Sequence, residues 1–148
     1  MTVTVTFSVR APIEVTWRAL LDVPGIVPCL PGVELTEVLA DRTYAGKFEL
    51  RLGPLHVSNR GRVQIVEAND QGYTVRMTAQ AVDGRQTGAT VRGQLRAGDG
   101  GTTVVMETEI VERGLLNRIG PGMVQVAAQR MAQRFALCLE RRLDATAP

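Results

Sequence analysis

The sequence predicts an α+β fold in which a curved antiparallel sheet of about seven strands wraps around one long C-terminal helix. Three observations favour it. Successive segments alternate apolar and polar residues with a period of two, as half-buried strands do. The last third of the chain repeats apolar residues at steps of three and four, as a helix with one buried face does. The 148 residues suffice for one domain with its own core, so we expect residues 1–148 to form a single domain.

The N-terminal segment predicts a strand and then two short helices. Residues 3–9 alternate valine and phenylalanine with threonine and serine, which indicates a half-buried strand. Pro12 opens a short helix that carries Trp17 on its apolar side. Residues 22–32 mix apolar residues with three prolines and two glycines, so they can hold only a turn or two of helix. We interpret this segment as a stiff apolar lid.

Six more strands are predicted before the long helix. Alternating segments occupy residues 33–39, 44–52, 55–65, 73–81, 89–95 and 104–110. Turn residues separate several of them, with the clearest hairpin signal at residues 98–101. A sheet with one polar face is covered on one side only, and the long helix has to cover it. Curling around the helix can leave a cavity between the two.

The C-terminal helix is predicted to begin at Pro121, because a proline in the first turn lacks an N–H that would be unpaired there anyway. About twenty residues beyond it give roughly 30 Å of helix. Its predicted buried stripe is Val124, Ala127, Met131, Phe135, Cys138 and Arg142, widened by Ala128 and Leu139. Most of the remaining positions are glutamine, arginine or glutamate, including Gln125 and Gln129, and these are expected to face water.

Charge and cysteine content exclude several classes of protein. The net charge of +2 is small and the basic residues do not cluster, so nucleic acid is not an expected partner. Cys29 and Cys138 have no spacing that suggests a disulfide framework or a metal site, and we expect them to be buried free thiols in a reducing compartment. Neither a signal peptide nor an apolar run of membrane-spanning length is present. The expected location is therefore cytoplasmic.

The inward-facing strand positions carry no residue that could act as a catalyst. Aspartate, glutamate, histidine, lysine and cysteine are missing from them, and the chain has no phosphate loop, metal-ligand spacing or nucleophile elbow. His56, the only histidine, falls on the outward face of its strand. We therefore predict no catalytic residue, no metal and no cofactor, and favour a binding protein over an enzyme.

The inward face instead carries small residues and methionines. Small residues leave volume unfilled, and methionine adapts to irregular apolar shapes; alternatively, the glycines only permit bending and the methionines fill a solid core. Asn59 is the one strongly polar inward residue, and its amide pairs with the backbone, with Thr108 or with the polar group of a ligand. The predicted ligand-binding set is Trp17, Ile26, Leu30, Phe48, Leu50, Asn59, Met77, Val91, Met106, Ile119, Met123, Ala127 and Met131.

Several motifs together resemble one known family. They are residues 7–17, the Val27-Pro-Cys-Leu-Pro-Gly-Val-Glu34 stretch, Tyr44 to Gly46, Gly53-Pro54 and the glycine-rich entry to the last helix at residues 114–122. In these the chain is similar to the CoxG proteins of carbon monoxide dehydrogenase, which belong to the START-like, or SRPBCC, helix-grip superfamily. The resemblance spans essentially the whole chain. It implies a seven-stranded sheet that grips a long helix, with an apolar cavity between them.

The resemblance also implies a function. Members of the family accompany molybdenum hydroxylases of the carbon monoxide dehydrogenase type, so a complex of that kind is an expected partner. The expected ligand is an apolar small molecule, lipid-like or quinone-like. Many relatives carry a C-terminal membrane anchor, which this sequence lacks, so any membrane contact is expected to be peripheral. Two alternatives remain open: a cyclase-like enzyme of the same superfamily using the same cavity, and an interaction or maturation factor with a solid core.

Overall fold

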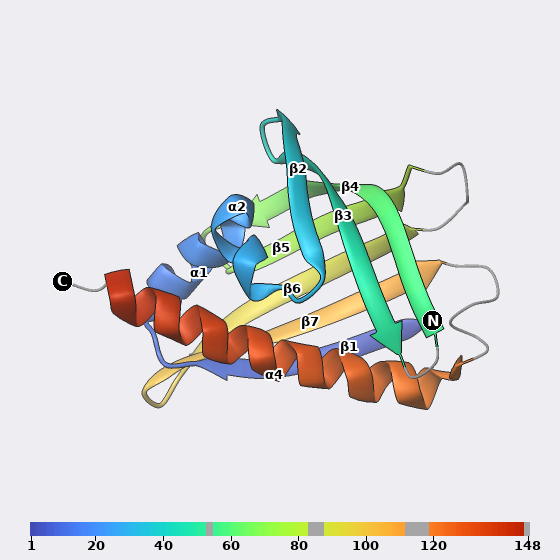
Figure 1. The fold of residues 1–148 in the computed structure, drawn as a ribbon. Helices are drawn as coiled ribbons and strands as arrows, with labels where there is room; N and C mark the ends of the chain where they lie inside the picture. The colour runs from blue at the N-terminus through green and yellow to red at the C-terminus, as the bar shows by residue number, and fades with distance from the viewer. Residues whose placement is uncertain (53–54, 83–87, 112–118, 147–148) are drawn as a thin grey trace.

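The computed structural model describes residues 1–52, 55–82, 88–111 and 119–146. A seven-stranded antiparallel sheet follows one long helix, with short helices inserted after the first strand (Figure 1). The elements in chain order are β1 (Thr2–Val9), α1 (Ile13–Leu21), α2 (Val23–Ile26), the 3-10 helix η1 (Val27–Cys29), β2 (Val33–Ala40), β3 (Thr43–Leu52), β4 (Leu55–Asn69), β5 (Thr74–Ala81), β6 (Gly88–Gly98), β7 (Gly101–Val111) and α4 (Pro121–Thr146). The predicted fold class is confirmed.

The strands lie in the order β1-β7-β6-β5-β4-β3-β2, so β1 and β2 form the two edges. Each strand after β2 pairs with its predecessor in sequence, as a meander does, while β1 closes onto β7. The sheet curves strongly, and β2 and β3 cross above the helix while β1 runs beside it (Figure 1). A register shift after Ile65 in β4 marks a bulge, and bulges increase the local bend of a strand.

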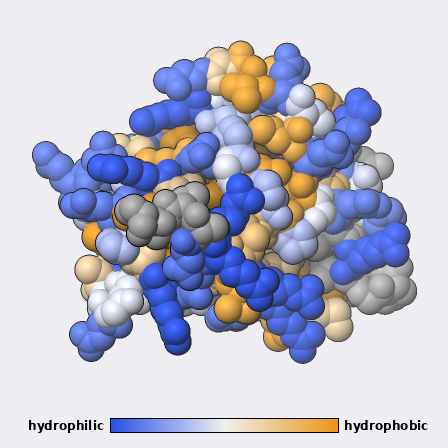
Figure 2. Space-filling view, turned by 60° about the vertical axis from the view of Figure 1, so that its left-hand side comes forward, coloured by the Kyte–Doolittle hydropathy of each residue, from blue (hydrophilic) through white to orange (hydrophobic). Residues whose placement is uncertain are grey.

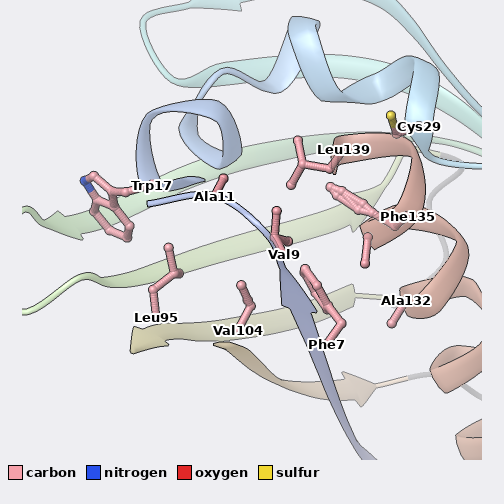
Figure 3. Packing of buried hydrophobic residues seen from close by; sticks show 11 residues of the cluster. Phe7, Val9, Ala11, Trp17, Cys29, Leu95, Val104, Ala132, Phe135 and Leu139 are labelled. Carbon is pink, nitrogen blue, oxygen red and sulfur yellow. The ribbon is translucent and has the colours of Figure 1, made fainter. Parts of the chain in front are cut away.

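The core gathers at the end of the sheet that α1 and the second half of α4 cover. Phe7 from β1 meets Phe135 from α4 edge to face, with ring centroids 5.6 Å apart. Leu139, Val9 and Val104 are almost fully buried beside them (Figure 3). The predicted amphipathic pattern is confirmed, although Ala132 and Ala136, which the predicted stripe omits, are buried as well.

Two glutamines of α4 bind the backbone of the edge strand β1, which corrects the expectation that both face only water. The N–H of Thr4 donates to Oε1 of Gln125 at 3.1 Å, and Nε2 of Gln125 donates back to the Thr4 carbonyl. Gln129 makes the same pair of bonds with Thr6, at 3.2 and 2.7 Å. Four helical residues rise about 6 Å and two strand residues about 6.7 Å, so glutamines four apart match alternate strand residues.

The cysteines form a disulfide, so the prediction of two free thiols is wrong. Cys29 in η1 and Cys138 in α4 are joined across 109 residues of sequence, with Cα atoms 5.5 Å apart. Sequence spacing cannot reveal such a pair, because only the folded chain places the residue after α2 against the last helix. The cysteines therefore no longer indicate a reducing compartment. Among the described residues, no helix combines the length and hydropathy that crossing a bilayer requires.

Candidate functional site

The strand register places the predicted strand residues on one face of the sheet. Directly opposed residues share a face, and Met77 lies opposite Val91. Val91 in turn lies opposite Thr108, which pairs with the buried Val3 of β1. This row belongs to the concave face that carries the core.

Two further pairs extend the concave face at both sides. Met106 lies opposite Val5 of β1, on the side that α4 approaches. Phe48 lies opposite Asn59, near the other edge of the sheet, and Val33 of β2 lies opposite Phe48. The predicted inward residues of β3 to β7 therefore do share one surface, with Asn59 as its amide-bearing member.

Ionisable side chains alternate onto the other face. One cross-strand row there runs Glu67, Arg76, Arg92 and Glu107. His56 is on this side as predicted: its side chain is 47% exposed, and Nε2 lies 2.6 Å from Oε1 of Glu49. In the described part of the chain, acidic, histidine and cysteine side chains form no group that could hold a metal ion.

One flank of α4 completes the candidate site. Met123, Ala127 and Met131 are four residues apart, so they lie in one row along the helix. Seven residues after Met131 the row reaches Cys138, whose sulfur is bonded to Cys29 of η1. The row therefore faces away from β1 and toward the side on which η1 packs. Gln125 and Gln129, on the opposite flank, hold the edge of β1.

Much of this apolar surface is only half covered. Because α4 lies along β1, at the edge of the sheet, it leaves the middle strands less covered than a central helix would. Phe48 is 39% exposed and Met123 is 58% exposed. The other concave-face members are half-buried: Asn59, Met77, Val91, Met106, Ala127 and Met131. Figure 2 shows apolar atoms reaching the surface between hydrophilic groups on the face that it presents.

Three predicted residues lie at the covered end instead. Trp17 is 5% exposed, and its Nε1 donates to Oδ1 of Asp70 at 2.8 Å. Ile26 and Leu30 pack against the same core cluster. These positions form an end wall of the concave face.

The two remaining predicted residues are described less fully. Ile119 is half-buried just before α4. Leu50 pairs with Val57 in the register, and its side chain lies outside the described part. The second predicted mobile wall, residues 114–122, also falls largely outside the described residues.

Two surface hollows are described, and both lie away from the predicted set. One of about 420 Å³ is bordered by the β6–β7 turn and by Arg10 to Ile13. The other, of about 540 Å³, lies on the outer face between Arg76, Arg92 and Glu107. The volume of a cavity beneath α4 stays a prediction.

A curved antiparallel sheet against one C-terminal helix, with an apolar concave face partly uncovered, defines a protein of the helix-grip class. The chain belongs to the CoxG family, the G component of carbon monoxide dehydrogenase, whose model matches residues 6–144. The resemblance of the sequence motifs to this family is thereby confirmed.

Solved structures share this fold at low sequence identity. A conserved protein from Geobacillus kaustophilus aligns with a TM-score of 0.79 and 13% identity over 99% of this chain and 97% of its own. TTHA0849 from Thermus thermophilus gives 0.68 and 20% over all of both chains. The ZhuI aromatase/cyclase from Streptomyces sp. R1128 gives 0.65 and 13% over 97% and 93%. No curated protein matches the sequence. At these identities the similarity establishes the fold alone.

Proposed function

We propose that this protein binds an apolar small molecule, lipid-like or quinone-like, on the concave face between α4 and strands β3 to β7. The observation that carries the proposal is the continuous half-exposed apolar surface formed by Phe48, Met77, Val91, Met106 and the Met123–Met131 row. An apolar surface left accessible in this way is typical of a ligand site.

Energetics favour an apolar occupant. Removing apolar surface from water contributes roughly 25 cal/mol per Å², so a ligand that covers several half-exposed side chains gains several kilocalories per mole. A charged ligand would lose its hydration without finding a counter-charge, because the ionisable side chains of these strands alternate onto the other face. Asn59 offers an amide near the Phe48 end of the surface, which suits a ligand with one polar group.

We further propose that the protein serves a molybdenum hydroxylase of the carbon monoxide dehydrogenase type as an accessory component. Membership of the CoxG family supports this role. Co-elution of the protein with a purified carbon monoxide dehydrogenase from the same source tests it directly. Separate elution at concentrations far above the complex's working range would contradict it.

Ligand binding is tested by filling the proposed site. Ala127→Trp puts a large ring on the flank of α4 that faces the concave surface, so we expect it to abolish uptake of an apolar fluorescent probe. Val126→Trp is the matched control: Val126 is the neighbouring residue but is 53% exposed on the outer side of the helix. Its probe affinity should stay within about twofold of the unmodified protein, since surface substitutions rarely change a distant site.

Native mass spectrometry of the purified protein adds an independent readout. An apolar small molecule that co-purifies with the unmodified protein, and not with Ala127→Trp, would support the proposal. Equal probe uptake by both tryptophan variants would place binding outside the concave face and would overturn it.

A further inference from the structure

We propose that the Cys29–Cys138 disulfide is a redox latch that holds a lid over one end of the ligand site. The lid is defined as residues 23–32, which comprise α2, η1 and the turn before β2. The inference rests on the proposed function for its ligand, but the latch itself can be measured without one. The disulfide is the only covalent link between the lid and the gripped helix.

The disulfide lies at the end of the proposed site. Cys138 continues the Met123–Ala127–Met131 row of α4, and Cys29 lies between Ile26 and Leu30 of the end wall. Figure 3 shows Cys29 beside the part of α4 that carries Phe135 and Leu139. A disulfide keeps its two Cα atoms within about 4.4–6.8 Å of each other. As long as it is intact, the middle of the lid cannot move away from α4.

The lid's own structure gives it little independent hold on the rest of the molecule. α2 has four residues and η1 has three, and a helix this short is not stable by itself. Its described backbone hydrogen bonds stay local: Leu30 N–H donates to Val27 and Val33 N–H donates to Leu30. Tertiary anchoring comes from the apolar side chains that it packs on the core and from the disulfide.

The two ends of the lid are fixed, so breaking the disulfide would release its middle. At the N-terminal end, the N–H of Gly25 donates to the side chain and backbone of Asp22, directly after α1. At the C-terminal end, the N–H of Glu49 donates to the Gly32 carbonyl at 2.8 Å, and Gly32 has φ +78°. This geometry suits a strap that loosens between two fixed points rather than a segment that unfolds completely.

The chemical step is a thiol–disulfide exchange with a dithiol reductant. One thiolate of the dithiol attacks Sγ of Cys138, the more exposed sulfur-bearing residue, and the Cys29 thiolate leaves and takes up a proton. The second thiol of the reductant loses its proton and attacks the mixed disulfide, which releases Cys138 and closes the reductant into a cyclic disulfide. Two electrons and two protons pass from the dithiol to the protein. The oxidised form retains its ligand and the reduced form exchanges it.

Dissociation kinetics of the apolar probe test the latch. In the oxidised protein, we expect dithiothreitol to raise the dissociation rate of the probe about tenfold while the protein remains folded. The association rate should change less, because changes within one binding site act mainly on dissociation. Cys29→Ser/Cys138→Ser is the matched variant: it should bind the probe, release it at the fast rate and ignore dithiothreitol. Equal dissociation rates in oxidised and reduced protein would overturn the latch.

Hydrogen exchange provides a readout that needs no ligand. Exposure times are chosen so that the amides of β6 and β7 remain unexchanged in both redox forms. Reduction should then accelerate exchange in residues 23–30 alone. Unchanged protection of the lid, or thiol counting that finds no disulfide in the air-oxidised protein, would overturn the proposal.

These arms also separate the two proposals. Redox-dependent lid exchange without any probe binding would support the latch and contradict the proposed ligand-binding function. Probe binding with a redox-insensitive lid would do the reverse.

Discussion

At the scale of single residues, Gly32 and Gly100 have the same backbone conformation in different surroundings. Both have φ +78°, a region that residues with a Cβ adopt only at a cost. A Cβ on Gly32 would lie 2.1 Å from the Glu49 carbonyl oxygen, whereas one on Gly100 would meet nothing within 4 Å. The pair therefore separates backbone strain from steric exclusion. At Gly32 the exclusion holds the lid close to β3.

We expect Gly100→Ala to lower the free energy of unfolding by about 1 kcal/mol, the cost of the left-handed conformation alone. Gly32→Ala should cost a further 1–3 kcal/mol or so, because the backbone of β3 must move to admit the methyl group. Urea denaturation of both variants checks the difference. Equal losses would show that β3 yields freely at this point.

Trp17 shows how a residue can satisfy a pattern and still have another role. Its size, its apolar ring and its position next to the lid predicted a place in the ligand site. In the structure its ring meets Tyr73 edge to face at 5.7 Å, and its N–H is bound to Asp70. A buried indole needs such an acceptor. No sequence pattern links positions 17 and 70, so only the folded chain could reveal the partner.

At the scale of elements, the feature that positions α4 is its grip on β1. An edge strand exposes unpaired N–H and C=O groups that invite pairing with other chains. The amides of Gln125 and Gln129 occupy these groups at Thr4 and Thr6, and Glu140 accepts from the N–H of Arg10 at 2.8 Å. The helix thus protects the edge and is itself held to one side of the sheet. The concave apolar face is left partly uncovered as a consequence.

Replacing Gln129 by methionine removes both bonds to Thr6 while keeping side-chain length and helix propensity. We expect a loss of about 1–2 kcal/mol of stability, since each hydrogen bond contributes about 0.5–1.5 kcal/mol and water can partly replace it at this exposed edge. Gln133→Met, one turn later on an exposed position, is the control and should stay within about 0.5 kcal/mol. Thermal unfolding of both variants provides the comparison. A loss at position 133 that equals the loss at position 129 would contradict the role assigned to the β1 edge.

At the scale of the whole molecule, the disulfide joins residues 109 positions apart and so constrains almost the entire chain. Closing a loop of this size removes about 4–5 kcal/mol of conformational freedom from the unfolded chain in the entropic model, and measured values for native disulfides run from about 2 to 5 kcal/mol. We expect Cys138→Ala, or full reduction, to lower the unfolding free energy by about 2–5 kcal/mol. Denaturant titration with and without reductant measures it. Coincident transitions would contradict a structural contribution.

The architecture follows from patterns that the chain carries locally. Alternation determined the inward and outward faces of the strands, and the register confirms that Met77, Val91 and Met106 share the concave face with the core. The proline at position 121 and the repeat that follows it marked the last helix. These predictions succeed because burial acts on each element with the period of its own geometry, about 2 for a strand and about 3.6 for a helix.

The tertiary structure decided what depends on distant pairs. Local periodicity is blind to whether Gln129 meets water or a strand edge, to the acceptor of Trp17, and to the bond between Cys29 and Cys138. Each of these contacts joins residues far apart in the sequence, and its geometry exists only after the sheet has curved and the helix has come to lie along β1. The sequence by itself determined an apolar concave face; the placement of α4 at the sheet edge determined how much of that face is left open to a ligand.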